Sequence, residues 1–207
     1  MTKIILVRHG HVEGIQPPRF RGREDLPLTE RGNAQARALA RRIESKWRVE
    51  KIYTSPLSRC IATAGSIASV CGIEAQSMEQ LIDIDYGTWQ MKSYEEMAAA
   101  EPALYAIWFD APQLMRFPAG ESLQELVSRS ANALRLVLEQ HRDWTVVLVS
   151  HDSINRALLM QLADLPLSSY WRLAQGPCCI NEIDIEDSRI LIRRTNDTSH
   201  LDDIQSP

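Results

Sequence analysis

Two histidines and two arginines in this sequence have the types and positions that phosphate chemistry needs. Arg8 and His9 come directly after a short apolar run, Ile4–Val7, and His151 follows a second apolar run. Arg59 stands at the start of a predicted helix. Arginine guanidinium groups bind phosphate or carboxylate oxygens through paired N–H donors, and a helix N-terminus adds oriented backbone N–H groups. These residues predict a local anion pocket, with phosphate as the expected ligand group.

His9 is the candidate nucleophile of this pocket. Neighbouring cations lower the pKa of a histidine and keep its ring neutral near pH 7, which leaves a ring nitrogen free to attack phosphorus. The sequence contains neither G-x-x-x-x-G-K-[ST] nor G-x-G-x-x-G, the two common glycine-rich phosphate loops. We therefore do not expect a nucleotide-binding loop.

A parallel sheet would bring these residues to one edge of the molecule. Short apolar runs alternate with helical patterns, which predicts an α/β fold with three layers, α/β/α, around a mostly parallel central sheet. Ligands bind such sheets beyond the carboxyl ends of the strands. The predicted strands cover residues 4–7, 51–54 and 144–150, helices begin near Thr29, Leu57 and residue 153, and capping boxes predict further helix starts at Ser93 and Ser122.

Three segments depart from this alternation. Residues of about 86–120 are rich in aromatic residues, Met and Pro, and we expect them to form a helical cap over the strand ends. Residues 180–185 and 189–194 flank a short polar turn and predict a hairpin at the edge of the sheet. The polar tail, about 196–207, is expected to be loose.

Length and composition favour a single domain that spans residues 1–207. The chain is 44% hydrophobic and 24% charged, which is typical of globular proteins. Its formal net charge of −4 gives no broad positive field, so we expect neither nucleic acid nor a membrane surface as a partner. The N-terminal residues lack a secretory signal pattern, which predicts a cytoplasmic location. The terminal hairpin or the cap could pair two copies into a homodimer.

Blocks of residues in a fixed order strengthen the phosphate hypothesis. Together they resemble the histidine phosphatase superfamily, also called phosphoglycerate mutase-like, over residues 3 to about 160, and the tail 196–201 is similar to the end of its small phosphatase branch. Each block alone is weak evidence, but the ordered set is specific. The blocks are LVRHG at 6–10, FRG at 20–22 with LPLTERG at 26–32, SPLSR at 55–59, GES at 120–122 and VSH at 149–151.

The resemblance implies a metal-independent phosphomonoesterase that needs no cofactor and acts on a small phosphorylated metabolite. His9 would accept the phosphoryl group as a phosphohistidine. Arg8, Arg59 and a protonated His151 would hold the phosphoryl oxygens of a loose transition state. Phosphoglycerate mutase-type phosphoryl transfer and a non-catalytic phosphate-binding module remain the alternatives.

The resemblance also implies a carboxyl group that protonates the leaving oxygen and then activates water. Asp83, within LIDIDYGTW at 81–89, matches the position of this acid, where the family usually has the longer Glu. Asp85 and Glu121 are the alternative donors. Further residues are expected around the substrate pocket, namely His11, Arg21, Gly22, Trp89, Glu121 and Asp152.

A metallohydrolase is the rival enzyme hypothesis. His9 and His11 are spaced like a pair of metal ligands, and Asp152 and His200 could complete the set. Arginines beside the pocket would repel a metal cation, so we expect no metal there.

Overall fold

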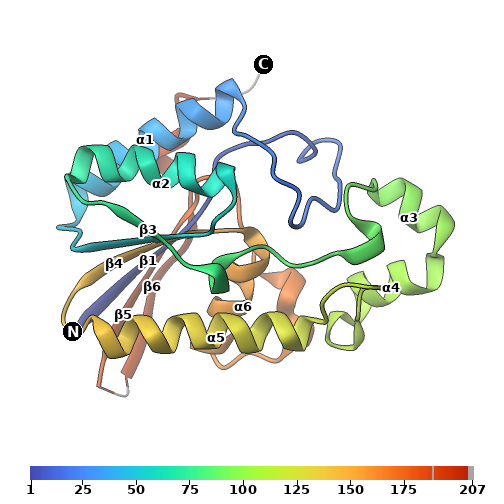
Figure 1. Cartoon of the computed structure of the whole chain (residues 1–207). Helices are drawn as coiled ribbons and strands as arrows, with labels where there is room; N and C mark the ends of the chain where they lie inside the picture. The colour runs from blue at the N-terminus through green and yellow to red at the C-terminus, as the bar shows by residue number, and fades with distance from the viewer. Residues whose placement is uncertain (188, 205–207) are drawn as a thin grey trace.

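The computed structural model describes residues 1–187 and 189–204, and a six-stranded sheet forms its centre (Figure 1). The strand order is β3-β2-β4-β1-β5-β6. The first four strands of this order pair in parallel, whereas β5 and β6 run antiparallel as the predicted terminal hairpin. The strands are β1 (Thr2–Arg8), β2 (Lys51–Thr54), β3 (Ala75–Ser77), β4 (Thr145–Ser150), β5 (Ile180–Glu186) and β6 (Arg189–Asp197).

Helices cover both faces of the sheet, as the alternating pattern predicts (Figure 1). One face carries α1 (Glu30–Lys46) and α2 (Ser58–Cys71), and the other carries α5 (Leu123–Gln140) and α6 (Asp152–Leu162). Successive residues of a strand point to opposite faces. Accordingly, Ile5 and Val7 of β1 pack in the α1–α2 layer, and Ile4 and Leu6 pack in the α5–α6 layer. The predicted three-layer α/β fold is confirmed.

The helix boundaries follow the capping signals in the sequence. The Thr29 side chain accepts from the Gly32 N–H at the start of α1. Gly72, with a φ of 66°, ends α2 in the left-handed region that glycine tolerates best. The capping boxes at Ser93 and Ser122 both form and begin α3 (Tyr94–Ala100) and α5.

The predicted cap projects beyond the carboxyl ends of the parallel strands (Figure 1). It contains α3 and α4 (Pro102–Asp110), with short 3₁₀ helices before and after them. Its base is an aromatic cluster in which the Phe20 ring lies 5.0 Å from Trp89 and the Phe117 ring lies 5.0 Å from Trp108. This cluster belongs to the same core as the α5–α6 layer, so the cap is anchored to the domain.

The structure corrects the prediction of a loose tail. Strand β6 continues to Asp197, and a 3₁₀ helix follows at 199–201. The Asn196 side chain accepts from the Gly176 N–H at 2.6 Å, and Leu201 packs against the α1–α2 core. The polar composition of the tail could not predict these contacts, because their partners lie far away in the sequence. The end of the predicted tail, 205–207, lies outside the described residues.

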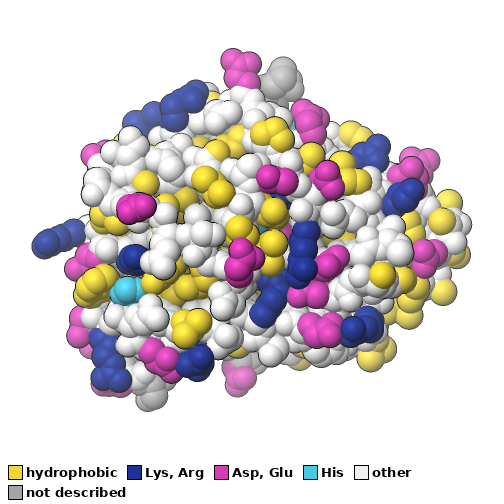
Figure 2. Space-filling view, viewed as in Figure 1, with side chains coloured by type: hydrophobic (Ala, Val, Ile, Leu, Met, Phe, Trp, Pro, Cys, Tyr) yellow, Lys and Arg dark blue, Asp and Glu magenta, His cyan; other side chains and the backbone are white. Residues whose placement is uncertain are grey.

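Surface and thiol features complete the fold. Acidic and basic side chains are interspersed over the face seen in Figure 2. Within the described ranges, no helix combines the length and apolar character needed to cross a membrane. The four cysteines are free in this structure. The short strand β3 was missed by sequence reasoning because its residues are polar and mostly exposed.

Candidate active site

The site begins where β1 and β4 end side by side. These strands are parallel, and Arg8 pairs in register with Ser150. A histidine follows each strand, and the His9 N–H donates to the Ser150 carbonyl at 2.9 Å. The centroids of the His9 and His151 rings lie 5.2 Å apart, and both side chains are buried. Adjacent parallel strands thus bring the two predicted histidines together.

Arg59 lies in the first turn of α2, fully buried beside the histidines. Its Nε donates to Nδ1 of His151 at 3.3 Å, and its Nη2 pairs with Oδ2 of Asp83 at 3.2 Å. Its other N–H groups donate to the carbonyls of Gly22 at 2.7 Å and Glu24 at 2.6 Å. The guanidinium therefore joins four separate segments of the chain at one point.

Arg8 brings the second buried guanidinium to the pocket. Its Nη1 donates to the Gln175 carbonyl at 2.5 Å, and its Nη2 lies 3.9 Å from Oδ2 of Asp152. Its Nε is buried and finds no hydrogen-bond partner in residues 1–187 and 189–204. An unsatisfied buried donor costs about 1–3 kcal/mol, which an oxygen of a bound anion would recover.

Asp83 lies next to both His151 and Arg59 and is only 4% exposed. Its Oδ2 is 3.5 Å from Nδ1 of His151, and its Oδ1 accepts from the Ile84 N–H at 2.9 Å and from the Ser153 hydroxyl. Burial raises the pKa of Asp83, against the opposing charge of Arg59. A carboxyl group in this position can keep its proton to higher pH than a solvated aspartic acid.

The hydrogen bonds of His9 fix its free nitrogen. Nδ1 lies 2.7 Å from the Gly10 carbonyl, which can only accept, so Nδ1 carries the proton and Nε2 keeps a lone pair. Burial, followed by the charge of Arg59, holds the pKa of His9 well below its usual range. This direction agrees with the predicted neutral ring, and burial is its largest single cause.

The hydrogen bonds of His151 match a neutral ring in this structure. Its Nδ1 accepts from Arg59, and its Nε2 lies 2.8 Å from the Ser55 hydroxyl. Burial, then the charges of Arg59 and Arg8, lower the pKa of His151 well below its usual range. Its hydrogen bond from Arg59 and its lowered pKa both favour a neutral ring, and residue types alone do not reveal this.

Known proteins share the sequence pattern and the fold of this chain. Residues 4–198 match the family model described as the histidine phosphatase superfamily (branch 1). The chain belongs to the histidine phosphatase superfamily. Its fold and its predicted resemblance are both confirmed, and membership supports phosphatase or mutase activity.

Three relatives show the range of this histidine phosphatase's similarities. It is 35% identical to phosphoserine phosphatase 1 of Hydrogenobacter thermophilus, over 97% of this chain and 95% of that protein. It is 31% identical to a probable phosphoglycerate mutase, GpmB, of Salmonella paratyphi B, over 98% of this chain and 96% of that protein. The solved structure of Bacillus stearothermophilus YhfR superposes with a TM-score of 0.92 at 27% identity, over 98% of this chain and all of that one.

The alternative acids, Asp85 and Glu121, both take part in ion pairs. Asp85 pairs with Arg23 at 3.2 Å and accepts from the Gly87 N–H at 2.8 Å. Glu121 accepts from Arg129 Nε at 2.7 Å. Burial favours the neutral form of Glu121, but hydrogen bonding and charge from Arg129 outweigh it and lower the pKa of this residue. Glu121 therefore supports the structure through its ion pairs, and its role as a pocket residue stays a prediction.

Trp89 was also predicted to line the pocket, and the structure corrects this. Its ring is fully buried against Phe20 and Phe117, and its Nε1 donates to Glu101 at 3.1 Å. Sequence reasoning could not distinguish a core aromatic residue from a recognition residue in a cap rich in both. Trp89 packs the cap base.

The other expected pocket residues lie around the site in different roles. Nδ1 of His11 lies 3.0 Å from the Thr29 hydroxyl, at the start of α1. Arg21 donates from Nη1 to the Gly14 carbonyl at 2.5 Å, and its Nε is buried without a partner in the described part of the chain. The carbonyl of Gly22 accepts a hydrogen bond from Arg59.

Asp152 places a carboxylate next to Arg8. It begins α6, directly after His151, and pairs with Arg156 at 3.1 Å. Burial opposes its ionisation, but Arg8 and Arg156 together lower its pKa far below the usual range. The pocket therefore contains an ionised carboxylate as well as its guanidinium groups.

Several supporting residues escaped sequence reasoning. Gln175 holds Arg8 through its backbone, Ser153 holds Asp83, and Arg129 holds both Glu121 and the backbone before Asp83. The sequence did contain one signal that could have identified Arg129. This residue lies three positions after Leu126, on the apolar side of α5, and a charged side chain there needs polar partners.

The rival metal-ligand set does not assemble. Within residues 1–187 and 189–204, no three His, Cys, Asp or Glu side chains form a group that could hold a metal ion. His11 lies at Thr29, and His200 belongs to the 3₁₀ helix after β6. His9, His11, Asp152 and His200 are thus not brought to one point.

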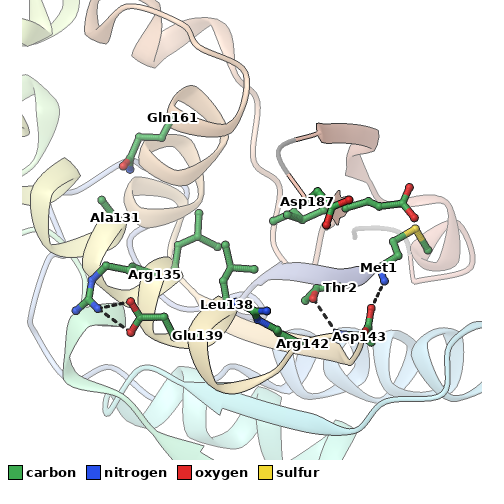
Figure 3. A pocket seen from close by; sticks show the side chains of 13 residues that line it. Met1, Thr2, Ala131, Arg135, Leu138, Glu139, Arg142, Asp143, Gln161 and Asp187 are labelled. Atoms are coloured by element: carbon green, nitrogen blue, oxygen red, sulfur yellow. Dashed lines mark hydrogen bonds and ion pairs between the residues drawn. The ribbon is translucent and has the colours of Figure 1, made fainter.

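A large cavity of about 790 Å³ lies elsewhere in this histidine phosphatase, at the amino end of β1 (Figure 3). Two pairs of its charged lining groups form ion pairs, Arg135 with Glu139 at 2.7 Å and the Met1 ammonium with Asp143. None of the predicted catalytic residues lines this cavity. Although this cavity is large, its lining residues do not include the histidines and arginines found at the strand ends.

Proposed function

We propose that this histidine phosphatase is a phosphomonoesterase that hydrolyses a small phosphorylated metabolite through a phosphohistidine on His9, with no metal ion or cofactor. One observation carries the proposal. Nε2 of His9 keeps a free lone pair, because Nδ1 is bound to the Gly10 carbonyl, in a pocket with buried guanidinium groups. Arg8 and Arg59 supply the positive charge that a phosphoryl group needs.

In the first step, Nε2 of His9 attacks phosphorus, forming the N–P bond as the ester P–O bond breaks. Arg8, Arg59 and His151 bind the phosphoryl oxygens, and their N–H groups match the charge of a loose transition state. The leaving oxygen takes the proton of Asp83, whose pKa burial raises. The products are the free alcohol, phosphohistidine and an ionised Asp83.

In the second step, water completes the reaction. The Asp83 carboxylate takes a proton from water as the water oxygen attacks phosphorus. The new P–O bond forms, the N–P bond breaks, and inorganic phosphate is released. His9 and Asp83 return to their starting protonation states.

Two considerations favour hydrolysis over mutase chemistry. A mutase must return the phosphoryl group to a second hydroxyl, and identity is greater to the phosphoserine phosphatase than to the probable mutase, 35% against 31%. Asp83 is also shorter than the Glu typical of the family's acid. Phosphoserine, named for one relative, and 3-phosphoglycerate are therefore the first metabolites to test.

The test measures p-nitrophenyl phosphate hydrolysis in the presence of EDTA and the trapping of acid-labile phosphate on the protein. We expect EDTA-resistant turnover and a loss of at least about 10³-fold in His9→Ala, with His200→Ala as the matched control that keeps its rate. Full activity in His9→Ala would reject the mechanism. Loss of activity with EDTA would indicate a metal enzyme, and phosphate binding without turnover would indicate a binding module.

Mutase activity is tested separately with 3-phosphoglycerate. Release of inorganic phosphate at the rate of substrate loss supports hydrolysis. Conversion of the substrate to an isomer, without phosphate release, would support the mutase alternative.

A further inference from the structure

A cluster of ion pairs fastens the segment that carries Asp83 to the base of the cap. This ionic cluster consists of Arg23, Asp85, Glu121 and Arg129. Arg23 bridges both carboxylates, with its Nη1 3.2 Å from Asp85 and its Nη2 3.2 Å from Glu121. Arg129 pairs with Glu121 through Nε at 2.7 Å and Nη2 at 3.0 Å. The proposed mechanism uses none of these four side chains.

Arg129 also holds the backbone of the acid segment, which we define as residues 79–87. Its Nη1 donates to the carbonyls of Gln80 at 3.1 Å and Ile82 at 2.6 Å, and its Nη2 donates to the carbonyl of Asp83 at 2.8 Å. Every nitrogen of this guanidinium is thus used on the acid segment or on Glu121. A planar fork of fixed donors can bind several acceptors at once, which a lysine ammonium cannot do in the same geometry.

The backbone of the acid segment crosses the cap base at very close range. The Glu121 N–H donates to the Asp85 carbonyl at 2.9 Å. A Cβ atom at Gly120 would lie 2.4 Å from that carbonyl oxygen, so only glycine permits this approach. The segment is therefore held on one side by the cap backbone and on the other by a guanidinium from α5.

Anchoring of this kind matters because Asp83 has a short side chain. With a single methylene between backbone and carboxyl group, any shift of the backbone moves the carboxyl group with it. Proton transfer requires hydrogen-bond distance to the leaving oxygen, and a displacement of about 1 Å can cost roughly 10²-fold in rate. The carboxyl group is 4% exposed and fixed by Arg59 and Ser153, so its position is set by its surroundings.

We propose that Arg129 is a positioning residue, which sets the Asp83 carboxyl group for proton donation by binding the three carbonyls of the acid segment. This inference rests on the proposed function, because it assigns the acid to Asp83. Arg129 does not touch the phosphoryl group in the proposed mechanism. We therefore expect its main effect on the proton that the leaving group needs.

The test compares substrates whose leaving groups differ in basicity, using kcat/KM, which reports the first phosphoryl transfer. An alkoxide, such as that from phosphoserine, must be protonated as it leaves, whereas p-nitrophenolate leaves readily without a proton. In Arg129→Met we expect kcat/KM to fall about 10²-fold for the alkyl phosphate and by less than about fivefold for p-nitrophenyl phosphate. Arg129→Lys should give a smaller loss with the same selectivity.

Controls separate positioning from stability. Arg135→Met is the matched control, because Arg135 lies on the same helix and pairs with Glu139 at the exposed surface. It should leave both substrates unchanged. If Arg129→Met fails to fold, as judged by circular dichroism and urea unfolding, Arg129→Lys carries the test. Equal losses on both substrates, or no loss, would overturn the positioning role.

Asp83→Asn distinguishes failure of this inference from failure of the proposed function. A selective loss on the alkyl phosphate in Asp83→Asn, without one in the Arg129 variants, would reject the positioning role and keep the acid assignment. An Asp83→Asn protein without this selectivity would reject the acid assignment and, with it, the role of Arg129.

Discussion

Replacement of Arg59 by lysine removes the guanidinium that joins four segments of the site. Arg59 is fully buried and donates to Gly22, Glu24, Asp83 and His151. A lysine ammonium keeps the charge but concentrates its donors at one point, so it cannot reach all four acceptors. At least two buried acceptors lose their partner in Arg59→Lys.

The size of the effect follows from these lost contacts. Each buried acceptor left without a donor costs about 1–3 kcal/mol, so the loss of two should lower the free energy of unfolding by roughly 2–6 kcal/mol. For a chain of this size, that corresponds to a drop in Tm of roughly 4–24 °C. Loss of the fork that binds phosphoryl oxygens should lower kcat/KM by about 10²–10³-fold.

Urea unfolding, followed by circular dichroism, measures the stability change, and p-nitrophenyl phosphate turnover measures kcat/KM. Arg37→Lys, on the exposed side of α1, is the control expected to change neither quantity. An Arg59→Lys protein with the wild-type urea midpoint and kcat/KM within about twofold of wild type would refute the reasoning. It would mean that neither the carbonyls nor the phosphoryl group depend on the guanidinium.

Three further predictions concern pH and backbone space. Because the pKa of His9 is held well below 6.5 and that of Asp83 is raised above 3.8, kcat/KM should be greatest on the acidic side of neutrality, and an alkaline optimum would contradict this. Folding stability in urea should decline as pH drops below 6.5, because the unfolded chain protonates His9 and His151 while the folded chain does not. Gly87→Ala should lower the free energy of unfolding by about 2–4 kcal/mol, because its φ is +52° and a Cβ would lie 2.1 Å from the Pro118 carbonyl, whereas Gly72→Ala, with open space around it, should cost about 1 kcal/mol.

Strand ends account for the part of the site that the sequence predicts. The apolar runs before His9 and His151 predict buried strands, and in a parallel sheet their carboxyl ends meet at one edge. Arg59 could be included because the turn after β2 leads straight into a helix. Because each of these residues follows a strand of the same parallel sheet, their proximity could be predicted from the order of the elements in the sequence.

Contacts between distant segments account for what the sequence could not predict. Gln175 and Arg129 act on the site through backbone carbonyls, and a carbonyl carries no sequence signature. Trp89 was predicted as a pocket residue because its type fits, but it is fully buried in the base of the cap. The protonation state of His151 likewise depends on burial, which residue type does not reveal.

The lowered pKa of His151 has a thermodynamic consequence. An arriving oxyanion stabilises the imidazolium, and the imidazolium in turn strengthens the hold on the oxyanion, so the two events are linked. Binding of sulfate, which does not itself titrate near neutrality, would then draw a hydrogen ion from bulk solvent. Affinity for such an anion rises with acidity, and the heat of binding varies with the ionisation enthalpy of the buffer.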